Sequence, residues 1–405
     1  MFNKIFARCL SALSFALLMC ACGGGGEAPA ASTALAASAL SPLAQLGQKV
    51  FSDRRLSGSG RMSCASCHDP AFAHGPANAL PVQVGGAFET EFGLRAAPSL
   101  RYLERQPGFS LSAAGVPVGG LMSDGRADNL AAQARLPIFN PRELDAGDEA
   151  TLARKLRAAA YAPQLAQLLR QDLTLADTAS VVSLALDALQ AFQREDPQLH
   201  PYDSKYDRFL AHQAHLSAAE WRGLQAFLDP ARGNCAACHP ATSASGKGPP
   251  LFTDFGYAAT GVPRHRAIPA NADPAYVDLG LCGPQRQDLS LRAELCGLFR
   301  TPSLRNVAAR PVFFHNGVFT SLAQVLDFYN TRDTAPARWY PGGRRFDDLP
   351  PAYQGNLSRL APFGAHIAGS EPPMSAQDLS DIECFLHTLS DSDVVALQAL
   401  PACQD

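Results

Sequence analysis

The amino-acid sequence predicts a mainly α-helical protein whose helices are joined by long loops. Three observations lead to this fold class: apolar residues recur at helical spacing in several segments, Pro and Gly are dense between 76 and 120 and between 240 and 275, and one short cysteine motif occurs twice. The 405 residues are 47% apolar and 18% charged, which is enough for a large packed core and excludes a disordered chain. A formal net charge of -3 gives no electrostatic footprint for nucleic acid.

The expected helices are amphipathic, with Leu, Val and Phe stripes that we interpret as core. A Ser217-Ala-Ala-Glu220 capping box opens one of them, and Pro163 is expected to end another. The segments with this spacing are 43–50, 152–161, 181–192, 217–228 and 375–389.

The first residues predict export. Lys4 and Arg8 precede an apolar run over 9–21, which is too short to span a bilayer but has the length of a signal peptide core. The signal peptide is assigned to 1–21, and Cys22 resembles the acylated cysteine of a bacterial lipoprotein, with a cleaved soluble form as the alternative. The Gly-, Ala- and Ser-rich residues 22–41 then form a flexible tether. The expected location is the periplasm, with a lipid anchor at Cys22 as the only membrane contact.

Two pentapeptides carry the attachment signature of c-type haem. They are Cys64-Ala-Ser-Cys67-His68 and Cys235-Ala-Ala-Cys238-His239. On a helical turn, residues i, i+3 and i+4 share a face, so two thiols can reach the porphyrin vinyl groups while the imidazole reaches the iron. A zinc site built from both pairs and a thioredoxin-like redox site are the alternatives. Neither uses the trailing His, and zinc pairs normally lie about 15 to 20 residues apart. The sequence therefore predicts two covalent haems with His68 and His239 as iron ligands.

Four further cysteines remain outside the export segment and the haem motifs. Cys282 lies near Cys296 in the sequence, and Cys384 lies near Cys403. In an exported protein such neighbours more often bridge than stay free, so two disulfides are expected, although the sequence does not fix their connectivity.

From Leu43 to Leu389 the chain resembles the bacterial di-haem cytochrome c peroxidases and their relative MauG. The resemblance rests on motifs at 50–57 (VFSDRRLS), 124–130 (DGRADNL), 299–306 (FRTPSLRN) and 313–317 (FFHNG). The stretches 328–333 (FYNTRD) and 337–341 (ARWYP) are similar to the MauG-like branch. The resemblance implies two cytochrome c-like domains, at 42–210 and 211–345, and a C-terminal segment, 346–405, that packs back on the N-terminal domain.

The family also implies a division of labour between the two haems. The haem on His68 would react with hydrogen peroxide, with Glu143 as the distal glutamate that moves a proton between the two oxygens. Gln133 and Pro137 match further distal positions. In many peroxidases of the family, a His in the loop that matches 80–95 blocks this iron until reductive activation, but that loop contains no His here. We therefore expect an iron that reacts with peroxide without activation. His74 is interpreted as a loop or propionate contact.

The haem on His239 would transfer electrons. Its sixth ligand in the family is Met or Tyr, and the position falls on Tyr329, while no Met lies between Met122 and Met374. An oxygen ligand stabilises ferric and higher states, as expected of a MauG-like protein. His315 matches a loop His for which we expect no direct ligation of iron.

The chain departs from the family at two positions. Ser123 stands where the family usually has a Trp between the haems, so the customary aromatic station for electrons is missing. Ala96 stands where the family's calcium site has an Asn, so a calcium ion is doubtful.

Three functions follow as alternatives. The first is reduction of hydrogen peroxide with electrons from a small cytochrome or copper protein. The second is a MauG-like oxidation of a side chain on a partner protein, which Tyr329 and the missing distal His favour. The third is a pure electron-transfer cytochrome, and the absence of a distal His in 80–95 argues against it.

Overall fold

A computed structural model describes residues 39–243, 246, 248–364, 367–394 and 403. The expected signal peptide, Cys22 and the tether up to residue 38 lie outside the described residues. Within the described part, no helix is both long and apolar enough to cross a membrane.

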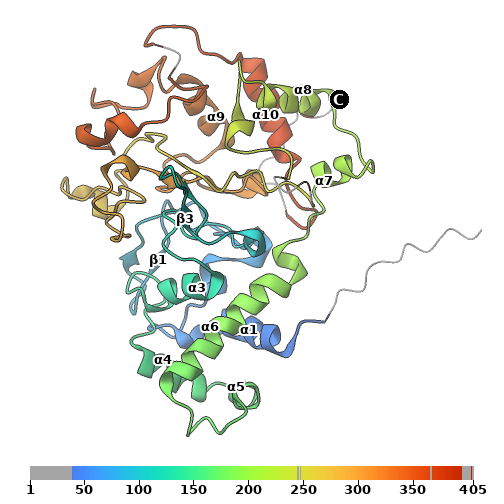
Figure 1. Cartoon of the computed structure of the whole chain (residues 1–405), viewed down its shortest axis with the longest axis vertical. Coiled ribbons are helices and arrows are strands. Elements are labelled where there is room, and N and C mark those ends of the chain that lie inside the picture. The colour runs from blue at the N-terminus through green and yellow to red at the C-terminus, as the bar shows by residue number, and fades with distance from the viewer. Residues whose placement is uncertain (1–38, 244–245, 247, 365–366, 395–402, 404–405) are drawn as a thin grey trace, which may run out of the picture. The chain divides into compact units, whose positions relative to one another are not determined.

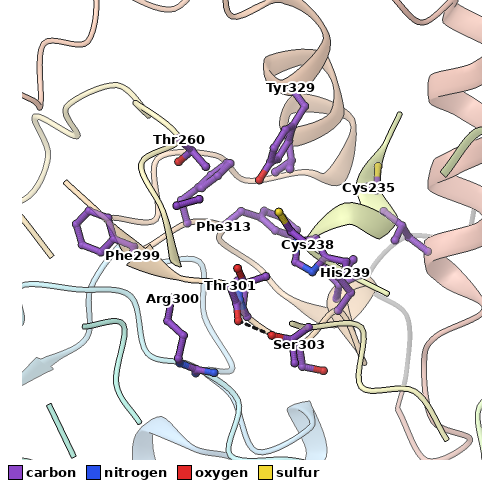
Figure 2. Close-up of a pocket in the computed structure, with 18 of the residues that line it drawn as sticks. Cys235, Cys238, His239, Thr260, Phe299, Arg300, Thr301, Ser303, Phe313 and Tyr329 are labelled. Carbon is purple, nitrogen blue, oxygen red and sulfur yellow. Dashed lines mark hydrogen bonds between the residues drawn. The ribbon is translucent and has the colours of Figure 1, made fainter. Parts of the chain in front are cut away.

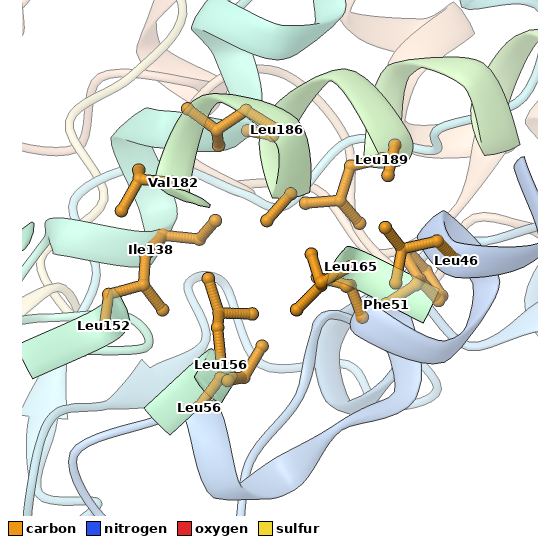
Figure 3. Packing of buried hydrophobic residues seen from close by; sticks show 14 of the residues in the cluster. Leu46, Phe51, Leu56, Ile138, Leu152, Leu156, Leu165, Val182, Leu186 and Leu189 are labelled. Carbon is orange, nitrogen blue, oxygen red and sulfur yellow. The ribbon is translucent and has the colours of Figure 1, made fainter. Parts of the chain in front are cut away.

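A first hydrophobic core forms around the long helix α6, which the other helices of the N-terminal half surround (Figures 1 and 3). In this core, Leu189 of α6 lies beside Leu46 of α1, and Val182 of α6 lies beside Ile138 of α3. Gly47 lets α1 and α6 cross closely, because a Cβ atom there would lie 1.9 Å from the Ala188 carbonyl oxygen. The helices are α1 (Pro42–Ser52), α3 (Leu130–Phe139), α4 (Glu149–Arg157), α5 (Ala162–Leu169) and α6 (Thr178–Glu195).

A second hydrophobic core lies in the C-terminal half, and it too contains two helices that cross closely at a glycine. Gly223 of α8 lies against α10, and a Cβ atom there would lie 1.9 Å from the Asp381 carbonyl oxygen. This core is rich in aromatic rings, among them Phe227, Phe252 and Phe385. Its helices are α7 (Lys205–Leu210), α8 (Ala218–Leu228), α9 (Leu322–Thr331) and α10 (Ala376–His387). The capping box at Ser217 and Glu220 is confirmed.

Long loops carry the only strands among the described residues. Three antiparallel pairs of two-residue strands occur: β1 (Val84–Gly85) with β2 (Glu91–Phe92), β3 (Ser110–Leu111) with β4 (Pro117–Val118), and β5 (Tyr257–Ala258) with β6 (Phe299–Arg300). The chain is thus mainly helical with long irregular connections, as the composition predicts.

The helix expected over 152–161 is present, but its expected end at Pro163 is wrong. Helix α4 ends at Arg157, and Pro163 lies in the first turn of the next helix, α5. Proline is tolerated there because the first backbone N–H groups of a helix have no partner inside it. Asn129, within the motif over 124–130, caps α3 by accepting from the Ala132 N–H.

The cores divide the chain between Leu199 and Tyr206. The C-terminal segment contacts both halves, since α10 belongs to the second core while Asp391 and Asp393 pair with Arg101. Two disulfides are present, joining Cys282 to Cys296 and Cys384 to Cys403, as expected.

Candidate active site

The first cysteine motif lies at the wall of a cavity of about 150 Å³ in the N-terminal half. Cys64 and Cys67 are the ends of a one-turn helix, α2 (Cys64–Cys67), and His68 follows directly. The Nδ1 atom of His68 lies 3.2 Å from the carbonyl oxygen of His74. Because a carbonyl oxygen only accepts, Nδ1 must carry the proton, which leaves Nε2 as the nitrogen that could bind iron.

Glu143, Gln133 and Pro137 line the same cavity as His68. Gln133 and Pro137 come from α3, and Glu143 from the loop that follows it. Burial raises the pKa of Glu143, against the lowering effects of a hydrogen bond from Asn140 and of the Arg126 charge. Asn140 donates to Glu143 Oε1 at 2.6 Å and so fixes the carboxyl group. The structure therefore brings Glu143, Gln133 and Pro137 together in one cavity, and burial there raises the pKa of the Glu143 carboxyl group.

The loop over 80–95 also reaches this cavity, through Gln83, Val84, Gly93, Leu94 and Arg95. None of these side chains is an imidazole. The nearest His in sequence, His74, is 1% exposed, and its backbone carbonyl supports His68. This carbonyl is a contact that the sequence did not reveal.

The second motif lines a separate cavity of about 310 Å³ (Figure 2). Cys235 lies in a short 3-10 turn, with Cys238 and His239 after it. The Nδ1 atom of His239 lies 2.8 Å from the carbonyl oxygen of Phe252, which leaves Nε2 to bind iron, as in the first motif.

Tyr329 of α9 lines this second cavity, and Figure 2 shows its phenol oxygen on the side where Cys238 and His239 lie. Its ring stacks between Phe314 and Phe363, with ring centroids 5.9 and 5.1 Å away. Burial raises the pKa of this phenol. The aromatic neighbours hold the ring in one orientation, with an oxygen donor facing the cavity.

His315 also lines the second cavity, stacked on Phe299 at 3.6 Å between ring centroids. Burial lowers the pKa of His315 to about 4, so the ring is neutral. Its Nε2 is buried and has no hydrogen-bond partner among the described residues.

The two donor sets fit one c-type haem each. Cys64, Cys67, Cys235 and Cys238 stand outside the disulfides, and each pair lines a cavity beside a His whose Nδ1 is already bonded to backbone. Because the pairs line different cavities, their thiols do not converge on one point, as a shared zinc ion would require.

One buried group near the sites was missed by sequence reasoning. Arg95 bonds Asp124 at 2.7 Å and forms a two-pronged ion pair with Asp278, 183 residues away in the chain. Burial alone would raise the pKa of Asp278, but Arg95 holds it below its usual value. No local motif signals such a distant pair.

Comparison with known proteins agrees with this geometry. The family model described as di-haem cytochrome c peroxidase matches residues 41–215. The methylamine utilization protein MauG of Paracoccus denitrificans is 36% identical over 332 residues, covering 80% of each chain. The crystal structure of the di-haem peroxidase BthA from Burkholderia thailandensis superposes with a TM-score of 0.82 at 40% identity over 89% of each chain. A MauG-like protein associated with microbial copper homeostasis gives a TM-score of 0.63 at 26% identity, over 87% of this chain and 91% of its own. The chain therefore belongs to the di-haem cytochrome c peroxidase and MauG family of oxidoreductases.

Proposed function

We propose that the protein reduces hydrogen peroxide to water, with electrons from a small cytochrome or copper protein. The observation that carries this proposal is the cavity in which Glu143 and Gln133 lie with His68. His68, Cys64 and Cys67 would hold one haem there, and that haem, when bound, supplies the iron that accepts and donates electrons. Two electrons and two protons convert one peroxide molecule into two waters.

Glu143 is the residue that transfers the proton in this proposal. Its carboxylate takes the proton from the inner oxygen of peroxide and returns it to the outer oxygen, which then leaves as water. The raised pKa favours uptake of the proton from the inner oxygen, and the hydrogen bond from Asn140 keeps the carboxyl group in place. The Gln133 amide offers a further hydrogen-bond donor or acceptor to the substrate, and the Pro137 ring adds an apolar wall.

The second cavity serves electron supply in this proposal. Cys235, Cys238 and His239 would hold the second haem, and Tyr329, which lines the same cavity, would supply an oxygen donor to its iron.

A MauG-like oxidation of a partner protein's side chain is the second candidate function. Tyr329 and the loop over 80–95 without a His favour it, because both allow reaction with peroxide without prior reduction. The 36% identity to a methylamine utilization protein also supports this second function. Export to the periplasm, with a lipid anchor at Cys22, is proposed from the N-terminal sequence.

The proton shuttle is tested by Glu143→Gln, which keeps the size of the side chain and removes its acid–base chemistry. The reaction with peroxide, followed by stopped-flow absorbance, should slow by roughly 100-fold or more. Wild-type rates should also fall as the pH drops through the pKa of Glu143, and the variant should lack this dependence. Glu89→Gln, at an exposed pair with Arg61, is the control and should react normally. An unchanged rate in Glu143→Gln removes this residue from the mechanism.

The two candidate functions separate in a second experiment. Stoichiometric peroxide is added to the fully oxidised protein with no donor present. A spectral change under these conditions supports the MauG-like reaction, while a change that requires one electron to be supplied first supports the peroxidase.

A further inference from the structure

Four residues line both cavities and thus form the wall between them: Ala96, Pro98, Met122 and Ser123. Ala96 and Pro98 offer only saturated carbon, and Ser123 offers a hydroxyl group that resists oxidation. Met122 alone brings a soft, polarizable atom, the thioether sulfur. We propose that Met122 is the bridge through which electrons pass between the two haem sites; the inference rests on the proposed function.

The sulfur of Met122 is held in a defined place. Gln133 Nε2 lies 3.7 Å from Met122 Sδ, so the thioether accepts a hydrogen bond from a residue of the first cavity. The backbone of the same residue is bonded to the second half, because Arg300 Nε donates to the Met122 carbonyl at 3.1 Å. Met122 is therefore tied to both cavities by its own atoms.

The backbone at Met122 adopts a conformation that non-glycine residues rarely take, with φ at +68°. Such conformations are costly and persist where surrounding contacts enforce them, often at functional sites. The contacts around Met122 must therefore hold its backbone in this conformation.

The turn that carries Met122 is anchored from both halves through Asp124. Arg95 and Arg126 bind the Asp124 carboxylate, and Arg286 donates to its backbone carbonyl at 3.0 Å. Side chains from both halves of the chain thus hold the turn next to Met122.

The other methionines of the described part provide natural controls. Met62 lines only the first cavity, and Met374 lines only the second. Both are as oxidisable as Met122 in chemical terms, but neither lies in the wall.

The electron balance is simple. A donor protein loses one electron to the His239 site, and Met122 passes it to the His68 site without net change. Two such passages, with two protons, reduce one peroxide molecule to two waters.

The test compares Met122→Leu and Met122→Gln with Met62→Leu in the complete di-haem protein. Carbon monoxide is flashed off the half-reduced protein, and the redistribution of one electron between the haems is followed by transient absorbance. Both Met122 variants should transfer the electron at least about tenfold more slowly, because they lack the polarizable sulfur. Met62→Leu, a change in the lining of the first cavity alone, should slow the transfer less than either Met122 variant does. The midpoint potentials of both haems should be unchanged in the two Met122 variants.

Wild-type transfer rates in both Met122 variants would overturn the proposal. So would a shift in either midpoint potential large enough to explain the slower transfer, since that assigns Met122 a structural role. No peroxide is used, so the result stands apart from the proposed function: transfer that depends on Met122 in a protein that does not reduce peroxide would reject only the peroxidase.

Discussion

The two cavities share one attachment motif and differ in what else lines them. Beside His68 lie Glu143 and Gln133, groups that donate, accept and move protons. Beside His239 lie Tyr329 and a set of Phe rings, with no carboxylate lining that cavity among the described residues. The difference teaches that the motif determines only where a cofactor is attached, while the remaining lining determines which chemistry is open to it.

The largest expected effect concerns the attachment motif that the two cavities share. Replacing Cys64 and Cys67 together by Ala should lower the intact mass by one haem, and the same change at Cys235 and Cys238 should do so independently. Mass spectrometry of the denatured protein reads this directly. If haem extracts from the wild-type protein into acidified acetone, covalent attachment is wrong.

Tyr329→Phe tests the lining of the second cavity, which differs from that of the first. Without the phenol oxygen, the His239 haem should lose its sixth ligand, become high-spin in its ferric form and rise in midpoint potential. Electron paramagnetic resonance and a redox titration measure both changes. Tyr353→Phe, in a short 3-10 helix outside both cavities, should alter neither. Unchanged spectra in Tyr329→Phe would exclude ligation by Tyr329.

Arg95 joins the two regions, so its removal should weaken the whole molecule. Arg95→Leu leaves Asp278 and Asp124 buried without this partner and should cost about 3 to 5 kcal/mol in the free energy of unfolding. Denaturant titration measures the loss. Arg338→Leu breaks a more exposed pair with Asp327 and should cost roughly 0 to 1 kcal/mol.

The same ion pair predicts an acid dependence. Arg95 holds the pKa of Asp278 below its unfolded value, so the folded state binds fewer protons there. This stabilisation is present above the unfolded pKa of about 3.9 and is lost as the pH falls through the lower folded value. Arg95→Leu should therefore unfold at a higher pH in an acid titration followed by circular dichroism. An identical acid midpoint in both proteins contradicts the assignment.

The smallest effect compares the helices that precede the two motifs. Ser41 caps α1 by accepting from the Ala44 N–H, and Ser217 caps α8 within a reciprocal capping box. Replacing either Ser by Ala should cost about 1 kcal/mol. Each hydroxyl also donates a second hydrogen bond, from Ser41 to Glu195 Oε1 at 2.9 Å and from Ser217 to the Cys403 carbonyl at 3.1 Å. The two costs should therefore be similar, and thermal unfolding measures both.

The local features of this protein were predictable from sequence, whereas the contacts between its halves were not. The haem motifs, the Ser217 capping box and the two Cys pairs each lie within about 20 residues of chain, so their spacing carries the information. Pro163 was misassigned because a proline that ends one helix and one that begins the next look alike in sequence.

The residues of the candidate site likewise divide into those that local motifs predicted and those that only the folded structure revealed. Glu143, Gln133 and Pro137 were found through motifs of the family, and the structure places them in one cavity, although their roles stay predictions. Met122 and Arg95 carry no motif, and their importance arises from partners that only the folded chain brings near.

The contacts of Arg101 bear on whether the repeated motif marks two separable modules. Arg101 follows the first motif, yet its buried guanidinium is neutralised by Asp391 and Asp393 from beyond the last helix. Asp207, at the start of the second core, likewise depends on Arg305. A fragment that ends near residue 210 would strand Arg101 and Asp207 as uncompensated charges in its interior. The five-residue motif occurs twice, but buried ion pairs join the two halves of the chain. A chain cut between the two motifs should therefore not give two parts that fold on their own.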